Sequence, residues 1–285
     1  MKWKKKVAWI TGASSGIGRA LALELARQGA EVVISGRRLE RLKSLHAEIS
    51  VMGGRAHIVP CDVSVEASIR DAVASIIHTC GALHVVIANA GWALRGDIEE
   101  LSMDDWERQF KTNVFGAALT ARYALPHLRE TGGRIGLVGS VSSMVPTPAH
   151  GAYTASKYAL RGLGQTLSLE LTGSGVSCTL LHPGFVASEV AQVDNHGVFQ
   201  PQRIDKRPSS LMWTADKAAR VMLGALHKRK REYVFTLHGK FAGFLGRHLP
   251  DVMYMLLRKK RFKTFEAPSN TAKAQQAAPL PRRKA

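Results

Sequence analysis

The sequence predicts an α/β fold with a doubly wound parallel sheet, and three observations support this prediction. Short β-branched runs alternate with longer amphipathic segments, which is the pattern of repeated βαβ units. A glycine-rich turn at residues 11–18 directly follows the first apolar run and opens a helix. The length of 285 residues suits one large domain better than two of average size. We therefore expect a Rossmann-like, seven-stranded sheet with helices on both faces, followed by a C-terminal helical extension.

Seven β-branched, apolar runs are expected to form the strands, and most of the segments between them the helices. The strands are predicted at residues 7–11, 31–35, 55–61, 84–88, 134–139, 176–182 and 233–236. The helices are predicted at residues 17–28, 39–52, 65–79, 103–128, 153–171 and 215–228. In a sheet of this kind, the ligand binds past the carboxyl ends of the strands, where the strand order reverses.

Three segments depart from this rhythm. Residues 185–213 contain Gly, Pro, Asn and mixed polar groups without a clean period, and they predict a long loop or a helix–loop lid. Residues 237–262 contain an apolar helical stripe that is broken near Pro250. The last residues are rich in Ala, Gln, Pro and Lys, which is typical of disorder. We therefore divide the chain into a Rossmann-fold domain at 1–236, an amphipathic extension at 237–265 and a disordered basic tail at 266–285.

The composition indicates a soluble protein of the reducing cytoplasm. Apolar residues make up 45% of the chain, which is ordinary for a globular protein. Cys61, Cys80 and Cys178 are scattered, without metal-ligand spacing, so we expect no disulfide framework. The 11 histidines show no paired-ligand pattern, and we expect no metal site. The apolar run after the basic residues 2–6 is too short for a secretory signal.

The formal net charge of +18 favours anionic partners. Phosphorylated cofactors, anionic lipid surfaces and acidic carrier proteins all fit. Basic residues gather at 2–6, 228–231, 258–263 and 282–284. These runs carry no nucleic-acid recognition motif, so nucleic acid is not an expected partner.

Tyr153 and Lys157 are four residues apart and so lie on the same side of a helix turn. A free phenol has a pKa of about 10, which makes it a poor acid or base at neutral pH. An ammonium group beside the phenol favours the phenolate. We therefore expect Lys157 to lower the pKa of Tyr153 toward the range in which it can exchange a proton with a substrate.

The glycines of the turn at residues 11–18 suit a pyrophosphate. Gly12 permits the tight turn, while Gly16 and Gly18 let the backbone approach the phosphates and pack on the sheet. Free amides at the start of the following helix then meet the negative charge. The turn thus predicts a dinucleotide site.

The residues after the second predicted strand indicate which dinucleotide binds. An enzyme that uses NAD places Asp or Glu there to accept from the ribose hydroxyl. This chain has Gly36, Arg37 and Arg38 instead. Guanidinium groups bind phosphate through paired, charge-assisted hydrogen bonds, so the sequence favours NADP(H) with its 2′-phosphate.

Taken in order, the GxxxGxG turn, Ser140 and the Tyr153-xxx-Lys157 pair resemble the short-chain dehydrogenase/reductase superfamily, in its ordinary-length, single-domain branch. The resemblance covers about residues 5–236 and implies hydride transfer between nicotinamide C4 and a ketone or secondary alcohol. It implies that Tyr153 supplies the proton and that Lys157 also binds the nicotinamide ribose. Ser140, chosen by its distance from Tyr153, would polarise the carbonyl. Asn113 would bend its helix and complete the proton relay.

The same resemblance assigns further residues to the cofactor. Asp62-Val63 matches a segment that contacts adenine, and Asn89-Ala90-Gly91 one that supports the sheet. Residues 183–186, Pro-Gly-Phe-Val, match a segment that meets the nicotinamide, with Ser188 in place of the usual threonine. The expected cofactor-binding set is Gly12, Ser14, Ser15, Gly16, Ile17, Gly18, Arg37, Arg38, Asp62, Val63, Asn89, Ala90, Gly91, Tyr153, Lys157, Pro183, Gly184, Val186 and Ser188.

The C-terminal stripe has two readings that the sequence leaves open. Its apolar side chains, flanked by Arg and Lys, suit an anionic membrane surface on the inner face of a membrane. They equally suit packing on the protein's own lid or on a second subunit. Either reading favours a lipophilic substrate, and the stripe loosely resembles that of reductases of keto-lipids such as 3-ketodihydrosphingosine.

Two other functions compete with reduction of a lipophilic ketone. A soluble 3-oxoacyl-carrier-protein reductase would also explain the basic surface, because its carrier is acidic. A non-catalytic NADP-binding or nucleic-acid-binding protein is the alternative from a different class. The presence of Ser140, Tyr153 and Lys157 together argues against it. The resemblance further implies a homo-oligomer, either a dimer or a tetramer.

Overall fold

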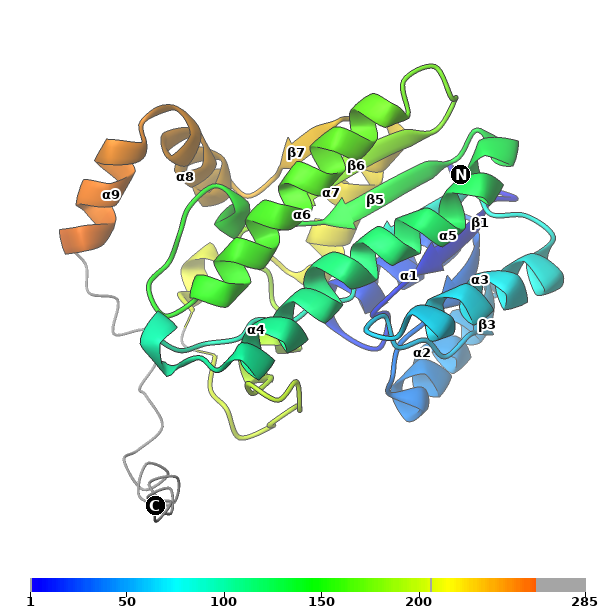
Figure 1. The fold of residues 1–285 in the computed structure, drawn as a ribbon. Helices are drawn as coiled ribbons and strands as arrows, with labels where there is room; N and C mark the ends of the chain where they lie inside the picture. The colour runs from blue at the N-terminus through cyan, green and yellow to red at the C-terminus, as the bar shows by residue number, and fades with distance from the viewer. Residues whose placement is uncertain (1, 206, 260–285) are drawn as a thin grey trace, which may run out of the picture.

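A computed structural model describes residues 2–205 and 207–259, and it contains a seven-stranded sheet (Figure 1). All paired strands are parallel, in the order β3-β2-β1-β4-β5-β6-β7. The strands are β1 Val7–Ile10, β2 Glu31–Ile34, β3 Arg55–Ile58, β4 Val85–Ala88, β5 Arg134–Val138, β6 Ser177–His182 and β7 Glu232–Val234. The predicted doubly wound sheet is confirmed, with strands one to three residues shorter than expected.

Helices cover both faces of the sheet, and each face has its own apolar core. Helices α1 Gly16–Arg27, α2 Leu39–Val51 and α7 Ala215–His227 pack on one face. Helices α3 Glu66–Cys80, α5 Gly116–Thr131 and α6 Gly151–Glu170 pack on the other. In Figure 1, α5 and α6 lie in front of the sheet. Strands β1 and β4 are buried throughout, as expected for parallel strands covered on both sides.

The strand order reverses between β1 and β4. From β1 the chain runs outward through β2 to β3, and from β4 it runs the other way to β7. The loops that leave β1 and β4 therefore diverge and open a crevice at the carboxyl edge of the sheet. This crevice is where the sequence places the dinucleotide.

The single helix predicted at 103–128 is wrong in one respect. The structure has α4 Met103–Phe110, a π-helical turn η2 Lys111–Phe115 and then α5. The turn contains buried Asn113, whose Nδ2 donates to Trp92 O (3.0 Å) and whose Oδ1 accepts from Trp92 N (3.1 Å). A π turn adds one residue to the helical turn, and such turns are frequent at functional sites.

Residues 185–213 form the expected loop-rich lid. Apart from position 206, which is not described, they contain two short 3₁₀ turns, η4 Glu189–Gln192 and η5 Ser209–Leu211, and two isolated bridges, and are otherwise irregular. An isolated bridge between Val186 and Trp213 closes the base of the lid. The lid is thus an excursion that leaves and rejoins the domain at one point.

The C-terminal extension consists of two helices, α8 Leu237–His248 and α9 Pro250–Lys259, drawn in orange in Figure 1. The predicted break falls at Leu249, immediately before Pro250, because proline is favoured at the first position of a helix. The remainder of the extension at 260–265 and the tail predicted at 266–285 lie outside the described residues. Within residues 2–205 and 207–259, no helix is long and apolar enough to span a membrane.

One face of α8 packs directly on the 3₁₀ turn η3 Val141–Ser143, which follows β5. A Cβ at Gly239 would lie 2.9 Å from Val141 Cγ2, and one at Gly246 would overlap the carbonyl oxygen of Met144. A small buried cluster of Met144, Val145, Leu245 and Met253 completes this contact. The extension is therefore part of the wall behind the residues that end β5.

Candidate active site

The carboxyl edge of the sheet holds a cavity of about 560 Å³ in which the predicted residues meet. Ser140 lines it from the end of β5, and Tyr153 and Lys157 line it from the first turns of α6. Of the predicted site residues, all except Gly18 and Asn113 line this cavity. The sheet topology thus brings together residues that are spread along the chain from Gly12 to Ser188.

The immediate surroundings of Tyr153 favour its protonated form. Its side chain is accessible from the cavity but otherwise enclosed, and this burial raises its pKa. The hydrogen bond with Ser140 and the charge of Arg207 act in the opposite direction without reversing the shift. The predicted lowering of this pKa by Lys157 is wrong for the structure as it stands.

The position of Lys157 explains that difference. Its Nζ donates to Val138 O at 2.9 Å and lies 5.8 Å from the centroid of the Tyr153 ring. Burial lowers the pKa of Lys157 to about 8, because a desolvated ammonium is less stable. The two groups are neighbours, but the ammonium is directed at the backbone of β5 rather than at the phenol.

Asn113 lies behind Lys157 rather than in the cavity. Its Nδ2 also donates to Ser156 Oγ at 3.1 Å. A Cβ at Gly91 would lie 3.1 Å from Asn113 Oδ1 and 3.7 Å from Lys157 Nζ, so the three residues are in contact. Asn113 therefore contacts α6 from the π turn, and its amide also fixes the loop after β4.

The glycine turn forms a cradle that larger residues would fill. Gly12 has a φ of +65°, which side chains rarely adopt, and a Cβ there would lie 2.8 Å from Ala90 Cα. A Cβ at Gly18 would overlap Gly12 O and Asn89 Nδ2. Asn89 Nδ2 donates to Thr11 O (3.0 Å) and Gly12 O (3.2 Å), so this predicted cofactor residue holds the turn in shape.

Arg38 joins the turn to the lid. Its Nη2 donates to Ser15 Oγ (2.7 Å) and Ser14 Oγ (3.2 Å), and its Nη1 pairs with Glu189 Oε2 at 2.7 Å. Arg37 is more exposed and reaches Gly197 O at 3.4 Å. The sequence did not reveal Glu189, because nothing local marks a carboxylate 151 positions away as the partner of Arg38.

The arrangement matches a known family. A family model described as short chain dehydrogenase matches residues 6–198. The chain belongs to the short-chain dehydrogenase/reductase family.

Relatives of this short-chain dehydrogenase bind either nicotinamide nucleotide. A short-chain dehydrogenase/reductase from Burkholderia phymatum in complex with NAD superposes with a TM-score of 0.79 at 26% identity, over 90% of this chain and 96% of that one. An alcohol dehydrogenase from Thermococcus sibiricus complexed with 5-hydroxy-NADP gives 0.71 at 28%, over 81% and 96%. A 3beta-hydroxysteroid dehydrogenase of Mediterraneibacter gnavus is 34% identical over 183 residues, which are 64% of this chain and 66% of the relative.

A buried histidine and three half-buried charged side chains stand behind Ser140. His182, at the end of β6, is fully buried, and its Nδ1 lies 3.1 Å from Ser140 O and 3.0 Å from Ser143 Oγ. Its Nε2 lies 2.9 Å from Glu232 Oε1. Arg161 of α6 and Arg247 of α8 pair with the same carboxylate, at 2.9 and 2.6 Å. No local pattern in the sequence marks this group, because its members are far apart in the chain.

Glu232→Gln should destabilise the protein by about 2–3 kcal/mol at neutral pH. Burial alone would raise the pKa of Glu232, but His182, Arg161 and Arg247 outweigh it and lower the pKa from 4.5 to about 2. Because the folded-state pKa is the lower one, this stabilisation is complete above pH 4.5 and is lost as the pH falls toward 2.

Urea unfolding of wild type and variant at neutral pH and at about pH 3 measures this difference, which should roughly halve at the lower pH. Glu40→Gln, which breaks an exposed pair with Lys43, is the control and should change stability by less than about 0.5 kcal/mol. If Glu232→Gln lowered the free energy of unfolding equally at both pH values, the lowered pKa of Glu232 would be contradicted.

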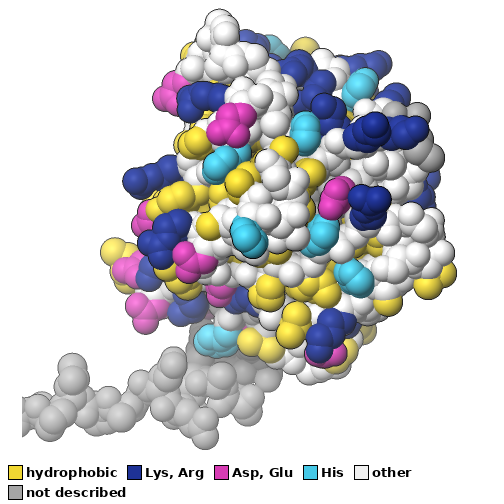
Figure 2. All heavy atoms as spheres, turned by 90° about the vertical axis from the view of Figure 1, so that its right-hand side faces the viewer, with side chains coloured by type: hydrophobic (Ala, Val, Ile, Leu, Met, Phe, Trp, Pro, Cys, Tyr) yellow, Lys and Arg dark blue, Asp and Glu magenta, His cyan; other side chains and the backbone are white. Residues whose placement is uncertain are grey.

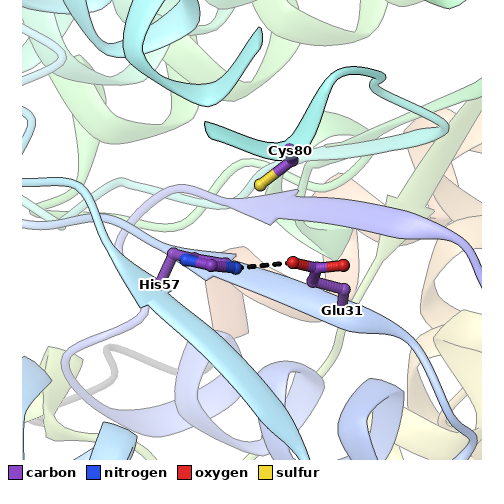
Figure 3. A group of neighbouring side chains, drawn as sticks. All are labelled: Glu31, His57 and Cys80. Carbon is purple, nitrogen blue, oxygen red and sulfur yellow. Dashed lines mark hydrogen bonds and ion pairs between the residues drawn. The ribbon is translucent and has the colours of Figure 1, made fainter. Parts of the chain in front are cut away.

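A second polar cluster lies outside the reaction site. Figure 3 shows Glu31, His57 and Cys80 directed toward one another, with candidate ligand atoms within 4.8 Å. His57 Nε2 and Glu31 Oε1 are 2.6 Å apart, so these two groups already pair with each other. Glu31 begins β2, at the amino edge of the sheet, and none of the three residues lines the cavity. The cluster takes no part in the chemistry at Tyr153.

Proposed function

We propose that the chain is an NADPH-dependent oxidoreductase that interconverts a lipophilic ketone and its secondary alcohol. The observation that carries the proposal is that Ser140, Tyr153 and Lys157 line one cavity with the glycine turn and Arg38. When bound, the nicotinamide supplies the hydride. Tyr153 gives its phenolic proton to the carbonyl oxygen, and Ser140 donates a hydrogen bond to the same oxygen. Lys157 carries a positive charge beside the phenol. This charge stabilises the phenolate that remains after the proton has left.

Arg38 supports NADPH as the preferred cofactor. Gly36 follows β2 where an NAD enzyme would present a carboxylate, and Arg38 lines the cavity beside Ser14 and Ser15. A guanidinium and two hydroxyl groups form a donor set for a 2′-phosphate. Glu189 now occupies part of that set, so a bound phosphate would compete with this carboxylate for Arg38.

Exposed apolar side chains on the two C-terminal helices support a lipophilic substrate and attachment to an anionic membrane surface. On α8, Leu237, Phe241 and Phe244 are 82%, 65% and 55% exposed and share one face. Met255 and Leu256 of α9 are also more than half exposed. Lys240 and Arg258 provide positive charge close to these side chains, as on an interfacial helix.

Wild-type protein should co-sediment with vesicles containing phosphatidylserine at low salt, and Phe241→Ser/Phe244→Ser should reduce the bound fraction several-fold. The reason is the loss of apolar area that would otherwise enter the headgroup layer. Val51→Ser/Leu169→Ser, which removes two exposed apolar side chains elsewhere, is the matched control. Binding that is absent, or equal in both double variants, would leave packing on a second copy as the function of α8 and α9.

The runner-up is a soluble 3-oxoacyl-carrier-protein reductase, which the basic surface favours. Figure 2 shows Lys and Arg side chains spread over one face of the molecule. The ring centroids of Trp3 and His227 are 5.4 Å apart, so the two basic segments 2–6 and 228–231 come together in space. Both segments precede strands and therefore lie at the amino edge of the sheet, opposite the cavity. An acidic carrier docked there would lie at the edge of the sheet opposite Tyr153, which argues against this alternative.

The proposal is tested by titrating NADPH and NADH against purified protein with a panel of ketones, from short diketones to a 3-oxoacyl thioester and 3-ketodihydrosphingosine. We expect kcat/KM to be at least tenfold higher with NADPH than with NADH. Among the ketones, we expect the highest kcat/KM for one with a long chain. Failure to bind either nucleotide would overturn the proposal. We also propose that the protein is a homo-oligomer. Light scattering of the same sample measures its molar mass in solution.

A further inference from the structure

Four charged side chains gather where the lid meets the loop after β4. Arg207 Nε and Nη2 bind the carboxylate of Asp205 through two bonds of 2.9 and 2.6 Å. Arg203 Nη1 donates to Val193 O at 2.9 Å. Arg95, from the loop after β4, reaches Val190 O at 3.2 Å through its Nη2. Three guanidinium groups and one carboxylate (+3 and −1) give these four residues a net charge of +2.

The side chains of the cluster are partly buried, and their positive charges repel one another. The side chains of Arg207 and Asp205 are 14% and 23% exposed. Burial, followed by repulsion from Arg203 and Arg207, lowers the pKa of Arg95 to about 10, and Asp205 only partly offsets this. A cluster of like charges in a poorly hydrated place is stabilised by an added anion, because the interaction there is weakly screened.

Arg207 links the cluster to the reaction centre. It lines the same cavity as Ser140, Tyr153 and Lys157. Its charge is also felt at the phenol, where it opposes the effect of burial on the pKa of Tyr153. A group bound at Arg207 would therefore share the cavity with the carbonyl that Tyr153 and Ser140 hold.

We infer that the substrate carries an anionic group near its ketone, and that Arg207 binds this group while Asp205 holds the guanidinium in place. The inference rests on the proposed function and specifies its substrate class. A carboxylate fits best, since the guanidinium, whose Nε and Nη2 bind Asp205, still has N–H donors on Nη1 and Nη2 that can meet two carboxylate oxygens. An ammonium group next to the ketone would be repelled by the net charge of +2, which argues against an amino-ketone such as a sphingoid base.

The test compares three ketones that share one alkyl chain and differ only near the carbonyl: a carboxylate, its methyl ester and an amine. With NADPH at saturation, wild type should show at least tenfold higher kcat/KM for the carboxylate than for the ester, and the amine should be the poorest. In Arg207→Gln the carboxylate-to-ester ratio should fall at least tenfold. Arg220→Gln removes the same charge from the exposed surface of α7 and should leave that ratio unchanged.

The outcomes separate this inference from the proposed function. Turnover of the three ketones without preference for the carboxylate overturns the inference alone, as does an Arg207→Gln variant that slows all three equally. If no ketone is turned over, the proposed function fails, and calorimetry of the corresponding alcohols decides the inference. Binding of the hydroxy-carboxylate at least tenfold tighter than that of the hydroxy-amine, lost in Arg207→Gln, would then support it. Equal binding would overturn it.

Discussion

Tyr153→Phe should lower kcat/KM for ketone reduction by about 10²–10⁴-fold, the range for loss of a general acid. The ring that lines the cavity remains, so NADPH should still bind with a Kd within a few-fold of wild type. Steady-state rates and fluorescence titration with NADPH measure the two quantities. Tyr158→Phe is the matched control, because Tyr158 is on the same helix, 42% exposed and outside the cavity. A Tyr153→Phe enzyme that keeps a tenth of wild-type activity would refute the assigned role.

The pH dependence of the wild-type rate follows from the same phenol. Because burial raises the pKa of Tyr153, its proton remains in place through the neutral range. Reduction needs the protonated phenol, so kcat/KM for the ketone should be level there and fall only at alkaline pH. Alcohol oxidation needs the phenolate and should rise over the same alkaline range. A reduction rate that rises with pH would contradict the role of the protonated Tyr153 phenol as the acid.

Arg38→Leu should weaken NADPH binding by about 10–100-fold and leave NADH binding nearly unchanged, since a hydrogen bond to a charged group contributes about 1.5–3 kcal/mol. The loss should appear in Kd(NADPH), measured by fluorescence titration. Arg19→Gln, which removes a guanidinium paired with Glu48 outside the cavity, is the control for net charge. Equal weakening of both nucleotides would show that Arg38 supports the turn rather than the 2′-phosphate.

Glu189→Gln should have the opposite effect on the same titration. Glu189 lies 2.7 Å from Arg38 and 3.6 Å from Arg41, so it competes with a 2′-phosphate for positive charge. Its removal should tighten NADPH binding and leave NADH binding unaltered. The pair of variants thus separates competition at Arg38 from a general effect on the lid.

The sequence predicted those parts of the site that are encoded by short motifs. Gly12 and Gly16 need backbone conformations that few residues adopt, and Tyr153 and Lys157 need only one helix turn to become neighbours. The buried apolar runs likewise predicted the strands and, through them, the edge of the sheet where these motifs meet.

Contacts between distant segments could not be predicted in this way. Glu189, Arg207 and Glu232 are ordinary surface residues by local pattern, and they acquire roles only when the lid and β7 are placed. The interruption of the helix at 103–128 is a similar case, because the π turn forms around a bond from Asn113 to another loop. The expected effect of Lys157 on Tyr153 failed because spacing gives proximity but not the direction of a side chain, and Nζ points to Val138 O.

Helix α8 has consequences for how the enzyme is assayed. Gly246 touches Met144 behind the Ser140 turn, and Phe244 is exposed to solvent. Only the thickness of one helix, about 10 Å, separates the two environments. Under the proposed attachment to a membrane surface, turnover on vesicles describes the enzyme with this outer surface in lipid, whereas turnover in lipid-free buffer describes it with the surface in water. The two rates are distinct properties of the same chain, and a substrate screen run only in buffer samples the first.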